Sequence, residues 1–315
     1  MTTELATALD AVVSAELSAE IDNGLPAVNS YLVSDPWAEE LLRPALTGWL
    51  AESDTADTAG WLAEGGSWPG GIASGPNPAA LLAALAGLAV GGTIRVVNEG
   101  SAELFHAATL LGIPMHDGAA AGPVALVQLR RPWALPHRAE VEALARQVAP
   151  LPVLVDESDL DLCRASDSAA ALTGVVDNLI VVRRLPGIGR LAEQGGAFCL
   201  SSAALTAWLQ ATVPPLFGTP LALRVTRAVL ARLDLVGAGA PAERAREHRR
   251  QANLALVRRL TAAGADPGQP AQDAPAVRTD QAGAELAASW GWPVEPDRSF
   301  CPATGQLVER FRLPT

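Results

Sequence analysis

Two apolar segments decide the fold of this 315-residue chain: PVLVDE at residues 152–157 and NLIVVR at residues 178–183. Each is a short run of aliphatic, largely β-branched residues that ends in charged side chains, and VALVQL at residues 124–129 is a third such run. Short apolar runs separated by helical segments are typical of parallel strands buried on both faces of a sheet. We therefore predict an α/β fold with a mainly parallel sheet between helices.

The segments around these runs continue the alternation of strand and helix. Residues 77–90, NPAALLAALAGLAV, are apolar on nearly all sides and predict a buried helix, and TIRVVNE at 93–99 predicts another strand. Residues 102–111 predict a helix that ends at Gly112, because glycine adopts the left-handed conformation that closes many helices. Residues 137–148 predict an amphipathic helix.

Charged side chains stand at the ends of the predicted strands. Arg130, Asp156 and Arg183 all occupy such positions. Ligands of parallel α/β sheets bind beyond the carboxyl ends of the strands, so we expect the functional site at this edge. The glycine-rich run LPGIG at 185–189, next to Arg183, could present backbone N–H groups to an anion; a plain turn is the alternative.

The chain divides into three predicted parts. Helical spacing dominates after residue 200, and the stretch GADPGQPAQDAPA predicts an exposed loop before the tail. We expect an N-terminal arm with helices at 1–40, a large α/β domain at 41–235 and a small C-terminal subdomain at 236–315.

Composition narrows the functional classes. A formal charge of −11 and a pI near 4.9 oppose binding to nucleic acid or to an anionic membrane, so we expect a small-molecule or protein partner. The three widely spaced cysteines favour a reducing compartment. No apolar run approaches the roughly 20 residues of a membrane span, and residues 1–30 lack the basic start of a secretory signal. We expect a soluble, cytoplasmic protein.

Other chemistries leave no recognisable motif. The four histidines show no HxxxH or HExxH spacing and the cysteines form no CxxC, so we expect no metal site. Neither GxSxG nor GxxxxGK[ST] occurs, which disfavours the common hydrolase and P-loop classes.

The segment DES at 156–158, followed by NLIVVRRLPGIGRLA at 178–192, resembles the core of fold-type I pyridoxal-phosphate enzymes. Among these it is most similar to histidinol-phosphate aminotransferases and threonine-phosphate decarboxylases, which read DEAY and then NLIVLRTFSKAFGLAGLR. SGPNPAALL, EGSAELFHAATLLG and FRLP extend the resemblance upstream and downstream. It implies an aminotransferase-like large domain and a small C-terminal subdomain.

The same register places Gly187 where the family has the lysine that forms the Schiff base with pyridoxal phosphate. The chain contains no lysine at all, since all 23 of its basic residues are arginine. Arginine forms no stable imine and does not lose its proton in a useful range, so it cannot replace that lysine.

Most other functional positions implied by the resemblance are also changed. Asp156 remains where the family has the aspartate that pairs with the protonated pyridine nitrogen. Ser101 replaces the aromatic residue that stacks on the ring, Arg131 replaces the asparagine that bonds the ring hydroxyl, and Asp159 replaces a tyrosine. Asn77 lies in the segment that matches the family's phosphate-binding helix start. From these changes we expect that pyridoxal phosphate is unlikely and that the chain uses no cofactor.

The leading hypothesis is an aminotransferase-fold biosynthetic enzyme that acts without pyridoxal phosphate on a small amino-acid-like or carboxylate substrate. Asp156 and Asp159 would perform acid–base catalysis of a cyclisation, condensation or elimination. Arg131 and Arg312 would hold anionic groups of the substrate, with Arg183 available to an anionic ligand. As an alternative, these charged side chains form structural ion pairs, Arg312 for example with Glu309.

Two other functions stay open. In the first, the chain is a non-catalytic partner subunit, for example half of a heterodimer with a lysine-bearing homologue. For the assembly itself we expect a homodimer, with such a heterodimer as the alternative. The resemblance implies a site completed across a dimer interface, with Tyr31 in the place of a tyrosine donated to the neighbouring subunit. In the second, the chain binds pyridoxal phosphate or its amine form without a covalent bond.

Overall fold

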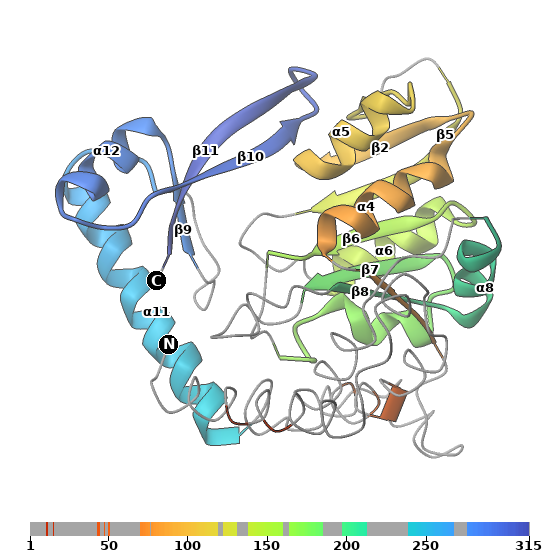
Figure 1. Ribbon diagram of the computed structural model, residues 1–315, viewed down its shortest axis with the longest axis horizontal. Coiled ribbons are helices and arrows are strands. Elements are labelled where there is room, and N and C mark those ends of the chain that lie inside the picture. Colours follow the sequence, from red (N-terminus) through yellow and green to blue (C-terminus); the bar gives the residue numbers. More distant parts are fainter. Residues whose placement is uncertain are drawn as a thin grey trace.

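The computed structural model describes eight segments of the chain and a few isolated positions near the N-terminus: residues 70–75, 77–118, 122–130, 138–159, 164–184, 197–212, 239–267 and 276–314. In these segments, helices cover both faces of a central sheet, and a smaller sheet with its own helices lies to one side (Figure 1). The predicted α/β class is therefore confirmed.

The central sheet has seven strands in the order β1-β8-β7-β6-β5-β2-β4. The strands from β7 to β4 are parallel, and they are β2 (Thr93–Asn98), β4 (Met115–His116), β5 (Val124–Arg130), β6 (Val153–Glu157) and β7 (Leu179–Arg184). Two antiparallel strands, β8 (Ala197–Ser201) and β1 (Gly71–Gly75), extend one edge. The sequence predicted four of the parallel strands, whereas β1 and β8 were not anticipated.

The predicted helices divide between the two faces of the sheet. On one face, α4 (Pro78–Ala86) and α5 (Ala102–Leu110) pack over the apolar side chains of β2, β5, β6 and β7. On the other face, α6 (Arg138–Val148) and the short 3-10 helix η3 (Ala169–Gly174) cover the same strands. A further 3-10 turn, η2 (Gly87–Ala89), follows α4, and α8 (Ala203–Thr212) packs against β1.

Alternation along β6 places adjacent residues on opposite faces of the sheet. Val153 and Val155 pack with α6 and η3, whereas Leu154 packs with α4 and α5. Successive side chains of a strand point to opposite faces, so the two acids that follow must also separate. Asp156 consequently lies on the α4 and α5 face, and Glu157 lies on the face of α6 and η3.

Both carboxylate oxygens of Glu157 accept hydrogen bonds on the face of the sheet covered by α6 and η3. Its Oε2 accepts hydrogen bonds from Arg183 Nη1 at 2.6 Å and from Ser168 Oγ at 2.5 Å, and its Oε1 accepts one from the Ala169 N–H at 2.7 Å. Both charged side chains are almost completely buried. A buried carboxylate is tolerated only when it is paired in this way, so the network ties β6, β7 and the start of η3 together.

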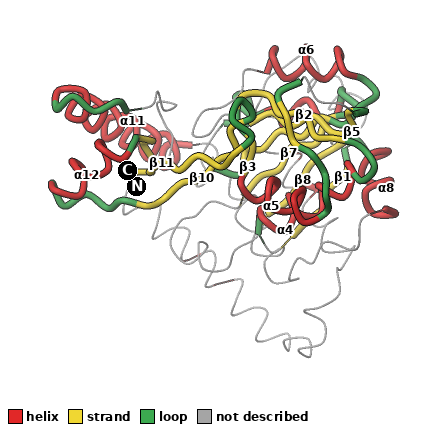
Figure 2. Tube along the Cα trace, turned by 90° about the horizontal axis from the view of Figure 1, so that it is seen from above, coloured by secondary structure: helices red, strands yellow, loops and turns green. Residues whose placement is uncertain are grey.

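The small sheet has the order β3-β10-β11-β9 and is antiparallel throughout. Its strands are β3 (Gly100–Ser101), β9 (Ala276–Thr279), β10 (Glu295–Cys301) and β11 (Gln306–Pro314). The long helix α11 (Gly239–Ala262) and α12 (Gln281–Ser289) pack against it around Leu256, Leu260, Val277 and Leu313 (Figure 2).

Strand β3 joins the two sheets. It follows β2 after Asn98, whose positive φ of 71° turns the chain out of the central sheet, and it then pairs with β10. Asparagine adopts this left-handed conformation more readily than most residues. A Cβ on Gly100 would lie 3.1 Å from Phe300, so the strand approaches β10 closely there, and Phe300 stacks on Phe105 of α5 at 4.8 Å.

Several sequence predictions fall outside the described residues. They are residues 213–238 of the region with helical spacing, the turn at 185–189, and the domain boundaries near residues 40 and 235. Within the described segments, no helix combines the length and apolar character needed to cross a bilayer.

The buried pair of Glu157 and Arg183 gives a stability prediction. We expect Arg183→Met to lower the free energy of unfolding by about 3–5 kcal/mol, because it leaves the Glu157 carboxylate buried without its counter-ion. Urea denaturation measures this. The double variant E157Q/R183M should recover much of the loss. Arg146→Met breaks the exposed pair with Glu142 and should cost less than about 1 kcal/mol. Equal losses in R183M and R146M would contradict the assigned role of the buried pair.

Candidate functional site

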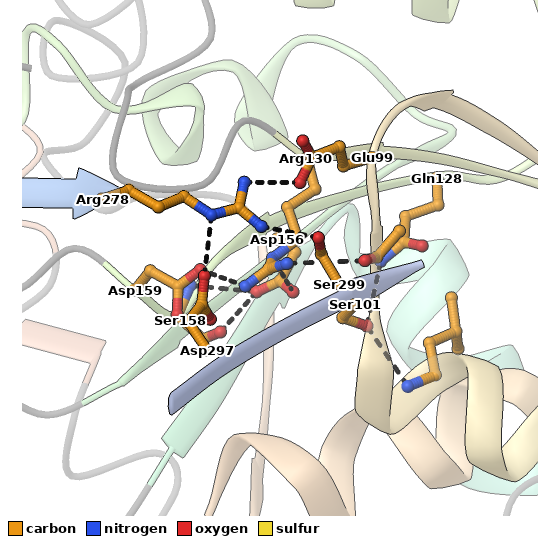
Figure 3. Close-up of polar contacts among 12 residues, drawn as sticks. Glu99, Ser101, Gln128, Arg130, Asp156, Ser158, Asp159, Arg278, Asp297 and Ser299 are labelled. Atoms are coloured by element: carbon orange, nitrogen blue, oxygen red, sulfur yellow. Dashed lines mark hydrogen bonds and ion pairs between the residues drawn. The ribbon is translucent and has the colours of Figure 1, made fainter. Parts of the chain in front are cut away.

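Polar side chains gather at the carboxyl ends of β2, β5 and β6, where the chain leaves the central sheet and enters β3 (Figure 3). Arg130 is the last residue of β5, Asp156 lies near the end of β6, and Asp159 lies just beyond it. Of the three strand-end residues expected at this edge, Arg130 and Asp156 meet here, whereas Arg183 lies on the other face of the sheet. The arrangement brings the predicted residues Asp156 and Asp159 together around a guanidinium group.

Arg130 is the centre of this group, and only 4% of its side chain is exposed. Its Nη2 donates a short hydrogen bond to Asp159 Oδ2, its Nη1 donates to the Gly100 carbonyl at 3.4 Å, and its Nε lies 3.4 Å from Asp156 Oδ2. Burial opposes the charge on Arg130, but Asp159 and Asp156 outweigh it and raise the pKa of the guanidinium. Arg130 is therefore a permanent buried cation.

One carboxylate oxygen of Asp156 accepts hydrogen bonds, and the other accepts none from the described residues. Its Oδ1 accepts hydrogen bonds from the Ser158 N–H at 3.0 Å and from Ser158 Oγ at 2.5 Å. Its Oδ2 is buried and accepts no hydrogen bond from any of the described residues. Arg130 Nε forms an ion pair with this oxygen at 3.4 Å, but no hydrogen bond joins the two atoms. Burial raises the pKa of Asp156, although Arg130 acts against this shift.

A second arginine connects the small sheet to this site. Arg278 of β9 donates to Glu99 Oε2 and to Ser299 Oγ, both at 2.6 Å, and its Nε lies 2.9 Å from Asp297 (Figure 3). Burial alone would raise the pKa of Glu99, but Arg278 outweighs it and holds this pKa below its ordinary value. The Arg278 contacts therefore fix the small sheet against the end of β2.

Ser101, which the sequence predicted as a ligand-binding residue, makes hydrogen bonds to α5 and β5. Its side chain is fully buried, and its Oγ accepts hydrogen bonds from the Leu104 N–H and from Gln128 Nε2, both at 3.2 Å. These bonds cap α5 and connect it to β5. The side chain lies beside the Arg130 group in Figure 3 without contacting it through a hydrogen bond in the described structure.

Three other predicted residues lie away from the group around Arg130. Asn77 caps α4, where its side chain accepts a hydrogen bond from the Ala80 N–H at 2.8 Å. Arg183 points to the opposite face of the sheet and pairs with Glu157. Arg312 is on β11 and pairs with Glu295 across the hairpin, rather than with Glu309, which pairs with Arg298. A clamp for substrate carboxylate at Arg312 stays a prediction.

The remaining predicted positions, Arg131, Tyr31 and Gly187, lie outside the described residues. Sequence reasoning placed Arg130 at the sheet edge but gave the site role to its neighbour Arg131. It missed Glu99, although this residue is the last of the strand predicted at 93–99. Arg278 and Asp297 were missed because nothing local in the sequence indicates which side chains of the small sheet face the central one.

Comparisons with known structures identify the fold. A histidinol-phosphate aminotransferase from Sinorhizobium meliloti, in complex with pyridoxal-5'-phosphate, is similar with a TM-score of 0.61 and 15% identity over 88% of this chain and 74% of that one. L-threonine-O-3-phosphate decarboxylase from Porphyromonas gingivalis has a TM-score of 0.60 and 13% identity over 95% and 92% of the two chains. This chain therefore has the aminotransferase fold of fold-type I.

A further histidinol-phosphate aminotransferase, from Clostridium acetobutylicum, has a TM-score of 0.64 and 11% identity over 95% of this chain and 90% of that one. Identities at this level show the fold alone. No protein-family model matches the sequence, and no curated protein sequence matches it either.

The expectation of a site without any cofactor is wrong. The structures similar to this chain are aminotransferase-fold enzymes, and the one from Sinorhizobium meliloti holds pyridoxal-5'-phosphate. The expectation relied on replaced residues taken one at a time. It overlooked that Asp156, in the place of the family's ring-nitrogen partner, keeps a buried oxygen to which no described residue donates.

The pH dependence of stability tests the burial of Asp156. Because its folded pKa is raised above the unfolded value of about 3.9, the protonated carboxyl stabilises the fold, and this contribution is lost as the pH rises through the folded pKa. Asp156→Asn removes the titrating group. We expect the unfolding free energy of D156N, relative to the unmodified protein, to increase as the pH rises from about 4 to about 7. Urea denaturation at a series of pH values measures this.

Glu247→Gln is a control of opposite sign for this experiment. Hydrogen bonds from Arg250 lower the pKa of the exposed Glu247 to about 2, so its stabilising contribution is present at higher pH and is lost on acidification. The relative stability of E247Q should therefore fall slightly as the pH rises. A difference between D156N and the unmodified protein that does not change with pH would contradict the raised pKa of Asp156.

Proposed function

We propose that this chain is an aminotransferase-fold protein that binds pyridoxal 5'-phosphate, or its amine form pyridoxamine 5'-phosphate, without a covalent bond. The observation that carries the proposal is the open Oδ2 of Asp156, which is buried at the carboxyl end of β6. A buried carboxylate oxygen without a donor is unfavourable, and a protonated ring nitrogen supplies an N–H donor together with a positive charge.

The surroundings of Asp156 suit this contact. Ser158 uses both of its donors on Oδ1, which fixes the plane of the carboxylate and leaves Oδ2 as the acceptor for a ligand. A charge-assisted hydrogen bond of this kind contributes about 1.5–3 kcal/mol. When bound, the cofactor supplies an electron-withdrawing ring that stabilises negative charge on a substrate carbon.

Binding would be non-covalent because the chain contains no lysine. Without lysine, the chain has no side-chain amine to tether the aldehyde of pyridoxal phosphate. At the start of α4 the donors are also few, because Pro78 has no N–H and Asn77 already accepts the one from Ala80. The proposal therefore assigns the ring-nitrogen contact to Asp156 and leaves the substrate and the reaction unassigned.

Titration of the purified protein with pyridoxamine 5'-phosphate, followed by isothermal calorimetry, tests the proposal. We expect saturable binding that Asp156→Asn weakens on the order of 10- to 100-fold, because the amide lacks the negative charge that pairs with the ring nitrogen. Glu142→Gln makes the same change of charge on the exposed surface of α6 and should leave the affinity unchanged.

The mode of attachment has its own measurement. After loading with pyridoxal 5'-phosphate and treatment with borohydride, peptide mass mapping should find the cofactor on no side chain, because no lysine is present to form an imine that is then reduced. If neither form of the cofactor binds, the proposal is wrong and the hypothesis of a non-catalytic partner subunit becomes the better one. Equal affinity in D156N and the unmodified protein would remove Asp156 from the site.

A further inference from the structure

Arg130 contacts two carboxylates unequally, although both are within reach. Its Nη2 donates a short hydrogen bond to Asp159, whereas its Nε stands 3.4 Å from Asp156 Oδ2 and makes no hydrogen bond there. The guanidinium and the Asp156 carboxylate are both almost completely buried, with 4% and 1% of their side chains exposed. Two opposite charges therefore form an ion pair in the interior, while the Nε donor of Arg130 and the Oδ2 acceptor of Asp156 make no hydrogen bond.

The other acidic residues near Arg130 do not explain why its Nε makes no hydrogen bond with Asp156 Oδ2. Asp297 and Glu103 also act on the guanidinium, and Glu99 lies close enough to be affected by it. None of these three makes a hydrogen bond to Arg130 in the described structure. The group that fixes the guanidinium opposite Asp156 is Asp159, with weaker help from the Gly100 carbonyl at 3.4 Å.

Arginine pairs best with a carboxylate through two parallel N–H···O bonds. If Arg130 made such a pair with Asp156, the open Oδ2 would be occupied and the ring nitrogen of a ligand would meet a satisfied acceptor. Asp159 prevents this by holding Nη2 on the other side. It can do so because it lies in the turn directly after β6, within hydrogen-bond reach of Arg130 Nη2.

We propose that Asp159 is a positioning residue that limits Arg130 to an ion pair with Asp156 without a hydrogen bond, and so leaves Oδ2 as an acceptor for the ring nitrogen of the ligand. The inference rests on the proposed function for its consequence in binding. The arrangement of Arg130 and the two aspartates is itself a property of the ligand-free protein. Asp159 therefore acts through Arg130 and not by contact with the ligand.

Truncation of Asp159 tests this role. In Asp159→Ala, Arg130 loses its preferred partner and should turn to Asp156. We expect the affinity for pyridoxamine 5'-phosphate to fall on the order of 10- to 100-fold, as in D156N, while the protein stays folded. Asp159→Glu keeps a carboxylate in the turn and should retain most of the affinity. The surface variant E142Q controls for the change in net charge.

A second substitution separates positioning from a general structural effect. Removing the guanidinium as well, in the double variant R130M/D159A, should restore much of the affinity that D159A loses, because nothing then competes for Asp156 Oδ2. A merely structural role of Asp159 predicts the reverse, since a second substitution in the same buried group would add damage. Unchanged affinity in D159A, or a double variant no better than D159A, would overturn the inference.

The crystal structure of ligand-free D159A gives an answer that does not depend on binding. The inference expects Arg130 to form a hydrogen bond with Asp156 Oδ2 there. An Arg130 that keeps its present position would overturn the inference, whether or not the ligand binds. If the unmodified protein binds neither form of the cofactor, the proposed function fails, and this structure still decides whether Asp159 positions Arg130.

Discussion

The burial of two adjacent acids at the end of β6 is the constraint on which the site depends. Asp156 and Glu157 are neighbours in the chain, but the strand sends them to opposite faces of the sheet, and each needs a separate partner there. Glu157 obtains a full set from Arg183, Ser168 and the start of η3. Asp156 obtains hydrogen bonds from Ser158 on one oxygen and an ion pair with Arg130, without a hydrogen bond, on the other. One strand end thus carries a fully paired acid on one face of the sheet and an acid with an unsatisfied oxygen on the other.

The second requirement is that the small sheet be held beside this strand end. The chain leaves β2 at a left-handed asparagine and enters β3, which belongs by its hydrogen bonds to the small sheet. Arg278 then connects β9 to Glu99, a residue 179 positions away in the sequence. A short crossing strand and one arginine therefore bring two separately packed sheets together. The polar group in Figure 3 lies where they meet.

Much of the central sheet was predictable because its signals are local. Apolar runs such as 152–157 and 178–183 predict buried strands whichever strands they pair with. The carboxyl ends of parallel strands lie at one edge of the sheet, and this placed Arg130 and Asp156 correctly. The small sheet was not predictable in this way. Its strands pair antiparallel in a register that depends on the whole hairpin, so Arg278 and Asp297 gave no local sign of facing the site.

The sequence by itself determined that this chain has no lysine, and with it that no side-chain amine can tether a cofactor covalently. It also determined which residue stands at the end of each parallel strand. Only the tertiary structure decided which of those side chains keeps a buried polar atom without a hydrogen bond. Hydrogen bonding depends on neighbours brought from other strands, and here Ser158, Arg130 and Asp159 together leave a single buried oxygen of Asp156 without a donor from the described residues.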